Sequence, residues 1–370
     1  MSKVGIIEYD KLEIGNCLMK NNTYLREWRC PLPSLTHGRN MFNNCINLTS
    51  FSADLSNLTD GWNMFHSCSF SSFNSDLSSL TNGSWMFAGC TALTSFSADL
   101  SNLTHGEAMF SNCITLSKFK ADPSGSPVNL SNLTDGSSMF SSCFNLTSFS
   151  SDLSSLMDGG RMFAYCNSLN TVTIKLKDIS TANGMFLGCS KLKTLNLEYY
   201  ANSPYGGIDC REMFNGCDFR NMNLNISLTN PTASSKHFIV GDGRRMFGYP
   251  EERDSNGNLT SNYVLNGEQW GKLIGGGWWL LGADNPRGAI FEATVDSNIM
   301  VPQSDGSIWC SATWLYRCGF RYFRIKYKDS NNKPVVVYGD KNMSPEYTFE
   351  KPDTTFWNTL IDDLSIAWGG

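Results

Sequence analysis

The chain has 370 residues, of which 41% are hydrophobic and 17% charged, and its net charge is -5 at pH 7. This length predicts two or three structural units rather than one small domain. The composition excludes a disordered chain, and the negative charge argues against nucleic acid as a partner because no basic surface is available to bind phosphates. No stretch approaches the run of about 18 apolar residues that a membrane-spanning helix needs.

Residues 1–30 precede the regular part of the chain and are predicted to form an N-terminal cap or attachment segment, because a solenoid needs a cover at its end. The apolar run Val4–Ile7 is short, and acidic residues follow it at once. We therefore expect no secretory signal peptide. Such a chain is expected to stay in the cytoplasm where it is made, or to leave by lysis or by a dedicated machine.

A motif of Met-Phe followed by Cys dominates residues 31–250. Nine Met-Phe pairs recur at spacings of 22 to 33 residues, and their methionines are Met41, Met64, Met86, Met109, Met139, Met162, Met185, Met213 and Met246. A cysteine stands four residues after eight of them, at Cys45, Cys68, Cys90, Cys113, Cys143, Cys166, Cys189 and Cys217. A period of this length indicates a solenoid, in which one short unit is stacked many times. It favours an extended surface over a deep catalytic pocket.

The unit that starts at Met86 shows what each position is expected to do. Met86, Phe87 and Cys90 have the spacing of one face of a short helix. Alternation between Leu93 and Asp99 predicts a short strand, and strands of neighbouring units would pair about 4.8 Å apart in a parallel sheet. The predicted fold class is an α/β repeat solenoid, a leucine-rich repeat with one short parallel strand and one short helix in each 23-residue unit.

These units resemble the BspA-like group of leucine-rich repeats, whose units read MFxxCxxLtsLdlsnfdtsnv. The stretch Met64–Cys68 matches this pattern, and so does the longer stretch Met139–Phe149. The resemblance covers roughly residues 32–247 and implies a leucine-rich-repeat solenoid. The family is known mainly from bacterial and protist surface proteins, often adhesins, and similar repeats occur on phage-encoded proteins. The lack of a signal peptide sets this chain apart from the bacterial surface proteins.

Eight of the 13 cysteines follow the repeat period. Free cysteine is among the most buried residue types, so we interpret this column as small core side chains with free thiols. Two alternatives remain open. One is a set of disulfide bonds between neighbouring units, and the other is a metal or redox array, although one cysteine per unit lacks the CxxC spacing of such sites.

A second column of the repeat is acidic and consists of Asp54, Asp76, Asp99, Asp122 and Asp152. We interpret these residues as turn or capping residues, with a calcium site as the alternative. His37 and His105 stand where other units have Asp before Gly, so they are interpreted as turn residues too. No GxSxG, HExxH, phosphate-loop or Rossmann motif occurs, so we expect no catalytic residue, no metal and no cofactor.

Two groups of residues in the repeat region are candidates for binding. The polar face of the predicted strands carries serines, of which we single out Ser95, Ser97, Ser148 and Ser150. Such hydroxyls can hydrogen-bond a glycan or a protein, and the simpler interpretation is a solubilising surface. An aromatic insertion at residues 199–207 supplies the second group, Tyr199, Tyr200 and Tyr205.

The repeat ends near residue 250, and residues 251–370 are predicted to form a separate β-rich or α+β domain that holds seven of the ten tryptophans. Alternation over Phe320–Lys328 and the apolar run Val335–Tyr338 predict two strands joined by a turn, and residues 353–369 predict a closing helix. The tryptophans of this domain fill a core, bind sugars or dock the solenoid to a larger assembly. Trp278 and Trp279 are the candidate contact residues.

These patterns favour a non-enzymatic structural or adhesion protein of a bacteriophage particle, associated with its tail or head and located in the virion after synthesis in the host cytoplasm. Its expected partners are other virion or surface proteins, a host glycan or surface receptor, and further copies of itself in a larger assembly. No nucleic acid and no membrane span are expected. The first alternative is a BspA-like adhesin of the bacterial cell surface, and the second is a glycan-active enzyme that uses the repeats for targeting.

Overall fold

The computed structural model describes residues 9–120, 128–200, 208–217 and 223–229, and the shorter segments 240–242, 263–266, 289–294, 300–302, 308–310, 320–328 and 334–340. The predicted boundary near residue 250 and the predicted closing helix at 353–369 lie outside the described residues. The chain divides into two compact units, Met1–Ile174 and Lys175–Gly370.

The described residues form strands, turns and loops, and they contain no helix. The strands in chain order are β1 (Glu27–Trp28), β2 (Ser50–Phe51), β3 (Ser72–Phe73), β4 (Ser95–Ser97), β5 (Lys118–Lys120), β6 (Ser148–Leu153), β7 (Thr171–Lys177), β8 (Thr194–Tyr200), β9 (Ile208–Asp209), β10 (Asn223–Thr229), β11 (Val240–Asp242), β12 (Tyr263–Asn266), β13 (Ala289–Thr294), β14 (Met300–Pro302), β15 (Ile308–Cys310), β16 (Phe320–Lys328) and β17 (Pro334–Asp340).

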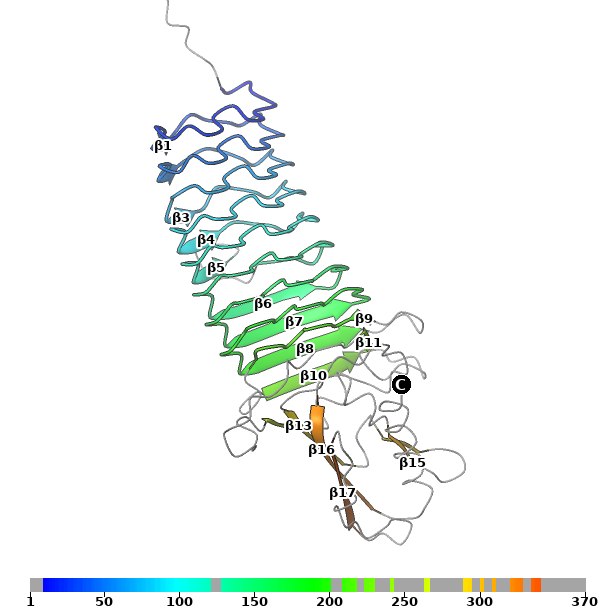
Figure 1. The fold of residues 1–370 in the computed structure, drawn as a ribbon. Coiled ribbons are helices and arrows are strands. Elements are labelled where there is room, and N and C mark those ends of the chain that lie inside the picture. Colours follow the sequence, from blue (N-terminus) through cyan, green and yellow to red (C-terminus); the bar gives the residue numbers. More distant parts are fainter. Residues whose placement is uncertain are drawn as a thin grey trace, which may run out of the picture. The chain divides into compact units, whose positions relative to one another are not determined.

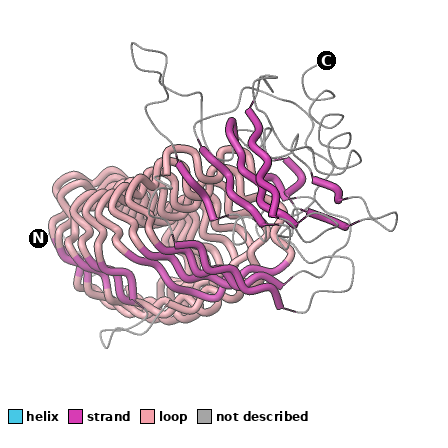
Figure 2. The backbone as a smooth tube through the Cα atoms, turned by 90° about the horizontal axis from the view of Figure 1, so that it is seen from below, coloured by secondary structure: helices cyan, strands magenta, loops and turns pink. Residues whose placement is uncertain are grey.

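Within the unit Met1–Ile174, each repeat makes one coil, and the strands of successive coils pair in parallel. β1 pairs with β2, and β3, β4 and β5 form a three-stranded sheet with Ser72, Ser95 and Lys118 in register. Figure 1 shows these strands stacked in chain order, and Figure 2 shows them along one side of the coils, with turns and loops forming the remainder. The predicted solenoid of parallel strands is therefore confirmed.

In the unit Lys175–Gly370, β8 and β10 continue the parallel pairing, and β9 pairs with β11. β8 and β10 are neighbours in their sheet, with Thr194 in register with Asn223. A separate sheet has the order β12-β13-β16-β17, and β14 pairs with β15. β16 and β17 pair antiparallel with Ile325 opposite Val337, which confirms the two strands expected there. The fold class of residues 251–370 stays a prediction.

The helix predicted for the Met-Phe segments is wrong for those from Met41 to Met213, and the segment at Met246 lies outside the described residues. Backbone N–H groups at alternate residues donate to carbonyls of the next coil at 2.8 to 2.9 Å, from Gly38 to Asp60, Asn40 to Trp62, Phe42 to Met64 and Asn44 to His66. Asn40 and Asn44 have positive φ, which an α-helix does not accept. The segment is a chain of tight turns, and its N–H groups connect coils instead of closing i to i−4 bonds. The spacing of Met, Phe and Cys fits both structures.

The core of each coil consists of the repeated apolar residues, and Met41, Phe42, Cys45 and Leu48 are all fully buried. The phenylalanines that follow the methionines stack in a column, as Phe42 and Phe65 do with centroids 5.4 Å apart and planes 4° apart. Phenylalanines of the strands form a second column that packs edge-on against the first, as the rings of Phe87 and Phe96 do. Such contacts add to the free energy of burying each ring.

The described part of the chain has no helix that is both long and apolar enough to cross a membrane.

Candidate functional site

The strand side of the solenoid carries the four candidate serines on two strands. Ser95 and Ser97 lie on β4 on either side of the buried Phe96, and both are partly exposed. Ser148 and Ser150 lie on β6 and are exposed. β4 and β6 belong to different sheets. The structure therefore places the serines in two pairs and not in one continuous row.

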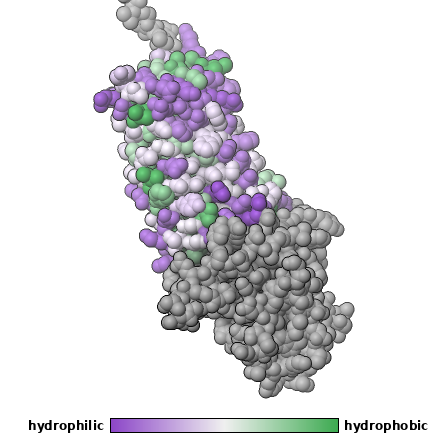
Figure 3. All heavy atoms as spheres, viewed as in Figure 1, coloured by the Kyte–Doolittle hydropathy of each residue, from purple (hydrophilic) through white to green (hydrophobic). Residues whose placement is uncertain are grey.

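Three of these four serines have a hydroxyl group that is free to bind a partner. Ser95, Ser148 and Ser150 make no side-chain hydrogen bond in the described part of the chain. The hydroxyl of Ser97 is buried and has no hydrogen-bond partner there, so a ligand cannot reach it directly. Figure 3 shows the described surface in that view as mainly hydrophilic or neutral, with apolar atoms in small separate groups.

Two of the aromatic candidates lie on a strand. Tyr199 and Tyr200 end β8, and their backbone pairs in register with β10. For these two tyrosines the structure describes the backbone alone. Tyr205, Trp278 and Trp279 lie outside the described residues, so their candidacy stays a prediction.

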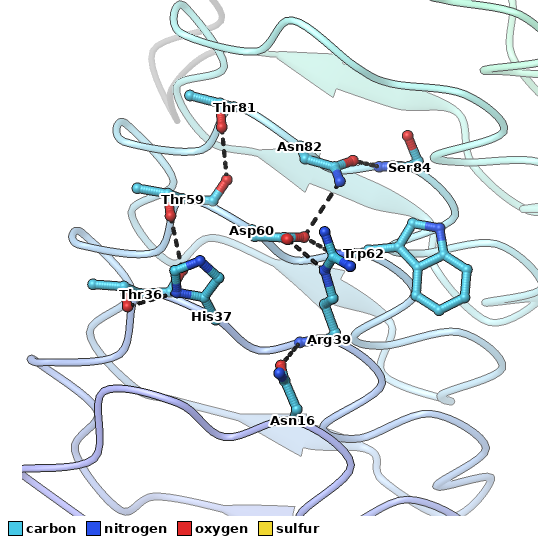
Figure 4. Close-up of polar contacts among 10 residues, drawn as sticks. All are labelled: Asn16, Thr36, His37, Arg39, Thr59, Asp60, Trp62, Thr81, Asn82 and Ser84. Atoms are coloured by element: carbon cyan, nitrogen blue, oxygen red, sulfur yellow. Dashed lines mark hydrogen bonds and ion pairs between the residues drawn. The ribbon is translucent and has the colours of Figure 1, made fainter.

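On the turn side of the solenoid, the carboxylate of Asp60 connects three neighbouring coils (Figure 4). Its Oδ1 accepts the backbone N–H of Trp62 at 3.1 Å and the Nδ2 amide of Asn82 at 3.3 Å. Its Oδ2 forms an ion pair with Nε of Arg39. Asp60 is only 7% exposed, and these donors offset the free-energy cost of burying its charge. The residue holds coils together and is not presented to solvent.

A row of threonines next to Asp60 also connects the coils (Figure 4). Oγ1 of Thr59 donates to the backbone carbonyl of Thr36 at 3.0 Å, and Oγ1 of Thr81 donates to the carbonyl of Thr59 at the same distance. His37 lies within hydrogen-bond distance of its neighbour Thr36, with 2.9 Å between Nδ1 and Oγ1. A parallel backbone bridge joins His37 to Asp60 of the next coil, so the two residues occupy the same position in their coils, directly before the turn.

The cysteine column is buried, as predicted, and it also makes hydrogen bonds that the sequence analysis did not anticipate. Thiols of this column donate to backbone carbonyls of the preceding coil, as Cys68 does to Phe42 at 3.3 Å and Cys90 to Phe65 at 3.1 Å. Burial raises the pKa of Cys90 from its usual 9.0 to about 12, so the neutral thiol is the stable form. None of the eight cysteines of the column forms a disulfide bond.

Aspartates of the acidic column close turns, as predicted. Oδ1 of Asp54 accepts the backbone N–H of Ser56 at 2.9 Å, and this hydrogen bond lowers the pKa of Asp54 below its usual 3.8. The same turn recurs at Asp76, Asp99 and Asp152 with distances of 2.8 Å. The fifth aspartate of the column lies outside the described residues. Across the described residues, no group of three or more His, Cys, Asp and Glu is placed to hold a metal ion.

The sequence analysis missed that residues 14–28 already have the turn segment and strand of a repeat coil. The backbone N–H of Gly15 donates to His37 and that of Met19 donates to Met41, each at 2.8 Å, as in the later coils. A 23-residue offset aligns Leu18 with Met41 and places Gly15 at a repeat glycine. That offset was the available signal, and it was hidden because Leu18 replaces the usual methionine.

Two exposed tryptophans on the turn side were also missed. Trp62 and Trp85 are each 38% exposed and lie on adjacent coils. Trp85 has a φ of 60°, at a position where other coils have residues such as Asn40 and Asn63. Large aromatic side chains at polar turn positions were the signal that could have identified them.

Comparison with known proteins agrees with the coil geometry. The family described as BspA type leucine-rich repeat region matches in six copies over residues 12–130 and 127–205, which together include 194 of the 370 residues (12–205). No curated protein matches the chain. A solved leucine-rich repeat protein from Bacteroides ovatus is similar at 18% identity and a TM-score of 0.31, over 76% of this chain and 82% of that one. The chain belongs to the BspA-type leucine-rich repeat family.

Proposed function

We propose that the chain is a non-enzymatic structural or adhesion protein that binds a protein or glycan partner through the strand side of its solenoid. The observation that carries this proposal is the pair of free, exposed hydroxyls of Ser148 and Ser150 on β6. The strand backbone fixes their spacing, so binding a partner orders few additional groups. A hydroxyl group both donates and accepts hydrogen bonds, which suits sugar hydroxyls and protein backbones alike.

The use of polar side chains within the coils supports a non-enzymatic role. Asp54 and Asp60 accept backbone N–H groups of turns, and His37 lies against its neighbouring threonine. The thiols of the cysteine column, such as Cys90, are buried and donate to backbone carbonyls. A catalytic acid, base or nucleophile needs a partly accessible group with an open position for substrate. The groups named here have structural partners instead.

Two settings fit this proposal, a bacteriophage particle and a bacterial cell surface. The resemblance described above is to bacterial surface proteins and to phage-encoded proteins. We propose the particle as the first setting to test, with the chain contacting the host surface or other virion proteins and occurring in several copies. An antibody raised against the chain would be used to blot density-purified particles and washed envelope fractions of the source culture. Signal confined to the envelope would contradict the particle setting and leave the adhesin.

The binding proposal is tested with whichever fraction carries the signal. The labelled full-length chain would be co-sedimented with that fraction, as wild type and as the double variant Ser148→Arg/Ser150→Arg. The arginines add bulk and charge on the exposed side of β6 without touching the core. We expect binding to weaken at least tenfold. Thr91→Arg, at an exposed turn position, is the matched control and should bind like wild type. Equal binding of the double variant and wild type would contradict the strand-side assignment.

A further inference from the structure

The N-terminal end of the described solenoid has a row of backbone acceptors without donors. In later coils, carbonyls at four alternate positions accept N–H groups from the coil before. The equivalent carbonyls of the first coil belong to Ile14, Asn16, Leu18 and Lys20, a set that we call the open end. No N–H within the described residues donates to any of these four carbonyls. The open end is therefore the acceptor half of a coil-to-coil interface.

Side chains of the first coil are also exposed where the equivalent side chains of later coils are buried in the interface between coils. Leu18 occupies the position of the repeat methionine, yet it is 44% exposed, whereas Met41 and Met64 are fully buried. Those methionines are buried because each lies against a glycine of the preceding coil, as Met64 does against Gly38. Leu18 has no such glycine among the described residues. Ile14 is 61% exposed on the same coil.

The structure also shows what covers this kind of surface. At each later interface within the first unit, the same four carbonyls are covered by the preceding coil, which supplies donors at alternate residues and a glycine opposite the methionine. We propose that the open end is a docking surface for one repeat coil of another polypeptide, with the same Gly-x-x-Met-Phe turn as the coils of this chain. Its glycine would receive Leu18, and its N–H groups would meet the four carbonyls.

A second copy joined by its own open end does not fit. A two-fold axis there would place the acceptor carbonyls of one copy against those of the other, and neither copy would supply the missing N–H groups. The complementary donors come from the opposite side of a coil. The open end is also separate from Ser148 and Ser150, so this inference goes beyond the proposed function and does not depend on it.

The test uses a synthetic peptide of residues 36–52 as the docking coil. This peptide contains Gly38, Met41 and Phe42 and supplies one complete turn segment and strand. Fluorescein-labelled peptide would be titrated with the full-length chain under reducing conditions, and binding followed by fluorescence anisotropy. We expect saturable binding that weakens at least tenfold in the Leu18→Ser variant. Met157→Ser is the matched control, because Met157 is 49% exposed on a later coil, and it should leave binding unchanged.

Two altered peptides test the mode of binding. In the peptide, Gly38→Val removes the space for Leu18, because even a Cβ at Gly38 comes within 2.8 Å of the Met64 sulfur in the chain. N-methylation of Phe42 removes the N–H that would meet the Leu18 carbonyl. Each change is expected to weaken binding at least tenfold, whereas a nonspecific hydrophobic contact would tolerate both.

Three outcomes would overturn the inference. The first is no binding of the unmodified peptide to the wild-type chain. The second is binding that Leu18→Ser and Met157→Ser weaken equally. The third is self-association of the wild-type chain in sedimentation velocity that Leu18→Ser abolishes, which would assign the open end to a second copy. Loss of binding at Ser148 and Ser150 would leave the result at the open end unaffected, so the two proposals can fail separately.

Discussion

The thioether sulfur of Met64 lies against Gly38 of the preceding coil, so closely that a Cβ on Gly38 would be 2.8 Å from it. The same relation joins Gly15 to Met41 at 2.7 Å and Gly61 to Met86 at 2.9 Å. Gly38 does not have a positive φ, so its glycine is explained by this close approach and not by backbone conformation. Glycine and methionine are thus one paired feature of the repeat.

Gly38→Ala is therefore expected to destabilise the chain by about 1–3 kcal/mol, because the added methyl group must displace a packed side chain. Urea unfolding followed by circular dichroism measures this change. The control is the same substitution in a Met64→Ala background, where the clash is removed. There we expect Gly38→Ala to cost less than about 0.5 kcal/mol. An equal effect in both backgrounds would show that the two residues do not interact.

Phe96→Asp is expected to unfold the repeat region. The ring of Phe96 is 1% exposed and stacks between Phe73 and Phe119. An unpaired carboxylate in this column costs several kcal/mol, roughly the whole stability of a domain. Phe144→Asp is the matched control, because Phe144 is 41% exposed, and it should change stability by less than about 0.5 kcal/mol. Wild-type melting of Phe96→Asp would contradict the stacked core.

Cysteine reactivity in the native chain is expected to follow exposure. Cys17 and Cys30 are exposed, whereas the nine cysteines from Cys45 to Cys217 are buried. A buried thiol is slow to form the reactive thiolate. Brief treatment of the native chain with iodoacetamide at neutral pH should modify these two first. Peptide mapping by mass spectrometry would locate the label, with urea-unfolded chain as the control for full reaction. Rapid labelling of Cys68 or Cys90 in the native chain would contradict their burial.

The buried thiols are expected to make the chain sensitive to alkali. Burial raises the pKa of Cys90 from 9.0 to about 12, so the folded state binds this proton more tightly than the unfolded state. The stability from this thiol is complete below about pH 9 and falls by up to about 1.4 kcal/mol per pH unit as pH rises toward 12. The stability gap between wild type and Cys90→Ala should therefore narrow between about pH 8 and pH 10.5. A constant gap in urea unfolding would contradict the shift.

Removal of the Asp60 carboxylate is expected to weaken the turn side. Asp60→Ala removes the carboxylate that accepts hydrogen bonds from Arg39, Trp62 and Asn82. The change should lower the free energy of unfolding by about 2–3 kcal/mol. Asp60→Asn keeps an oxygen for the backbone N–H of Trp62 and should cost less. Arg39→Ala should cost only about 0–1 kcal/mol, because the Arg39 side chain is 54% exposed and its ion pair is screened by solvent. Thermal melts of the three variants would be compared, and an Arg39→Ala effect as large as that of Asp60→Ala would contradict this ranking.

The core could be predicted from the sequence because its residues repeat. Met, Phe, Cys and Leu recur at fixed positions, and the residues at those positions, such as Phe87 and Cys90, are fully buried. The local conformation could not be predicted in the same way. Apolar residues at i, i+1 and i+4 fit a helical face, but they also fit a turn whose N–H groups point to the next coil. Only the positive φ at residues such as Asn40 and Asn44 distinguishes the two.

The candidate site could be predicted from the sequence less completely than the core. The strand serines could be proposed from alternation, but their exposure depends on neighbouring coils, and the buried hydroxyl of Ser97 differs from the exposed Ser150 for that reason. The open end required knowing that Leu18 stands in for a methionine and that no N–H group of the described residues donates to its carbonyl. Hydrogen bonds between coils cannot be identified from the sequence of one repeat, so these features are visible only in the assembled solenoid.

The hydrogen bonds of the cysteine column have an evolutionary consequence. The S–H of Cys90 points back to the coil before it, and the N–H of Phe87 points forward to the coil after it, at 2.9 Å from the Met109 carbonyl. Each junction within the unit Met1–Ile174 uses the same two directions of bonding. Duplicating or deleting one whole repeat of this unit in the gene would therefore leave each remaining junction there complete. The number of coils can thus change by unequal recombination between neighbouring repeats. The length of the solenoid can then change without new substitutions in its core.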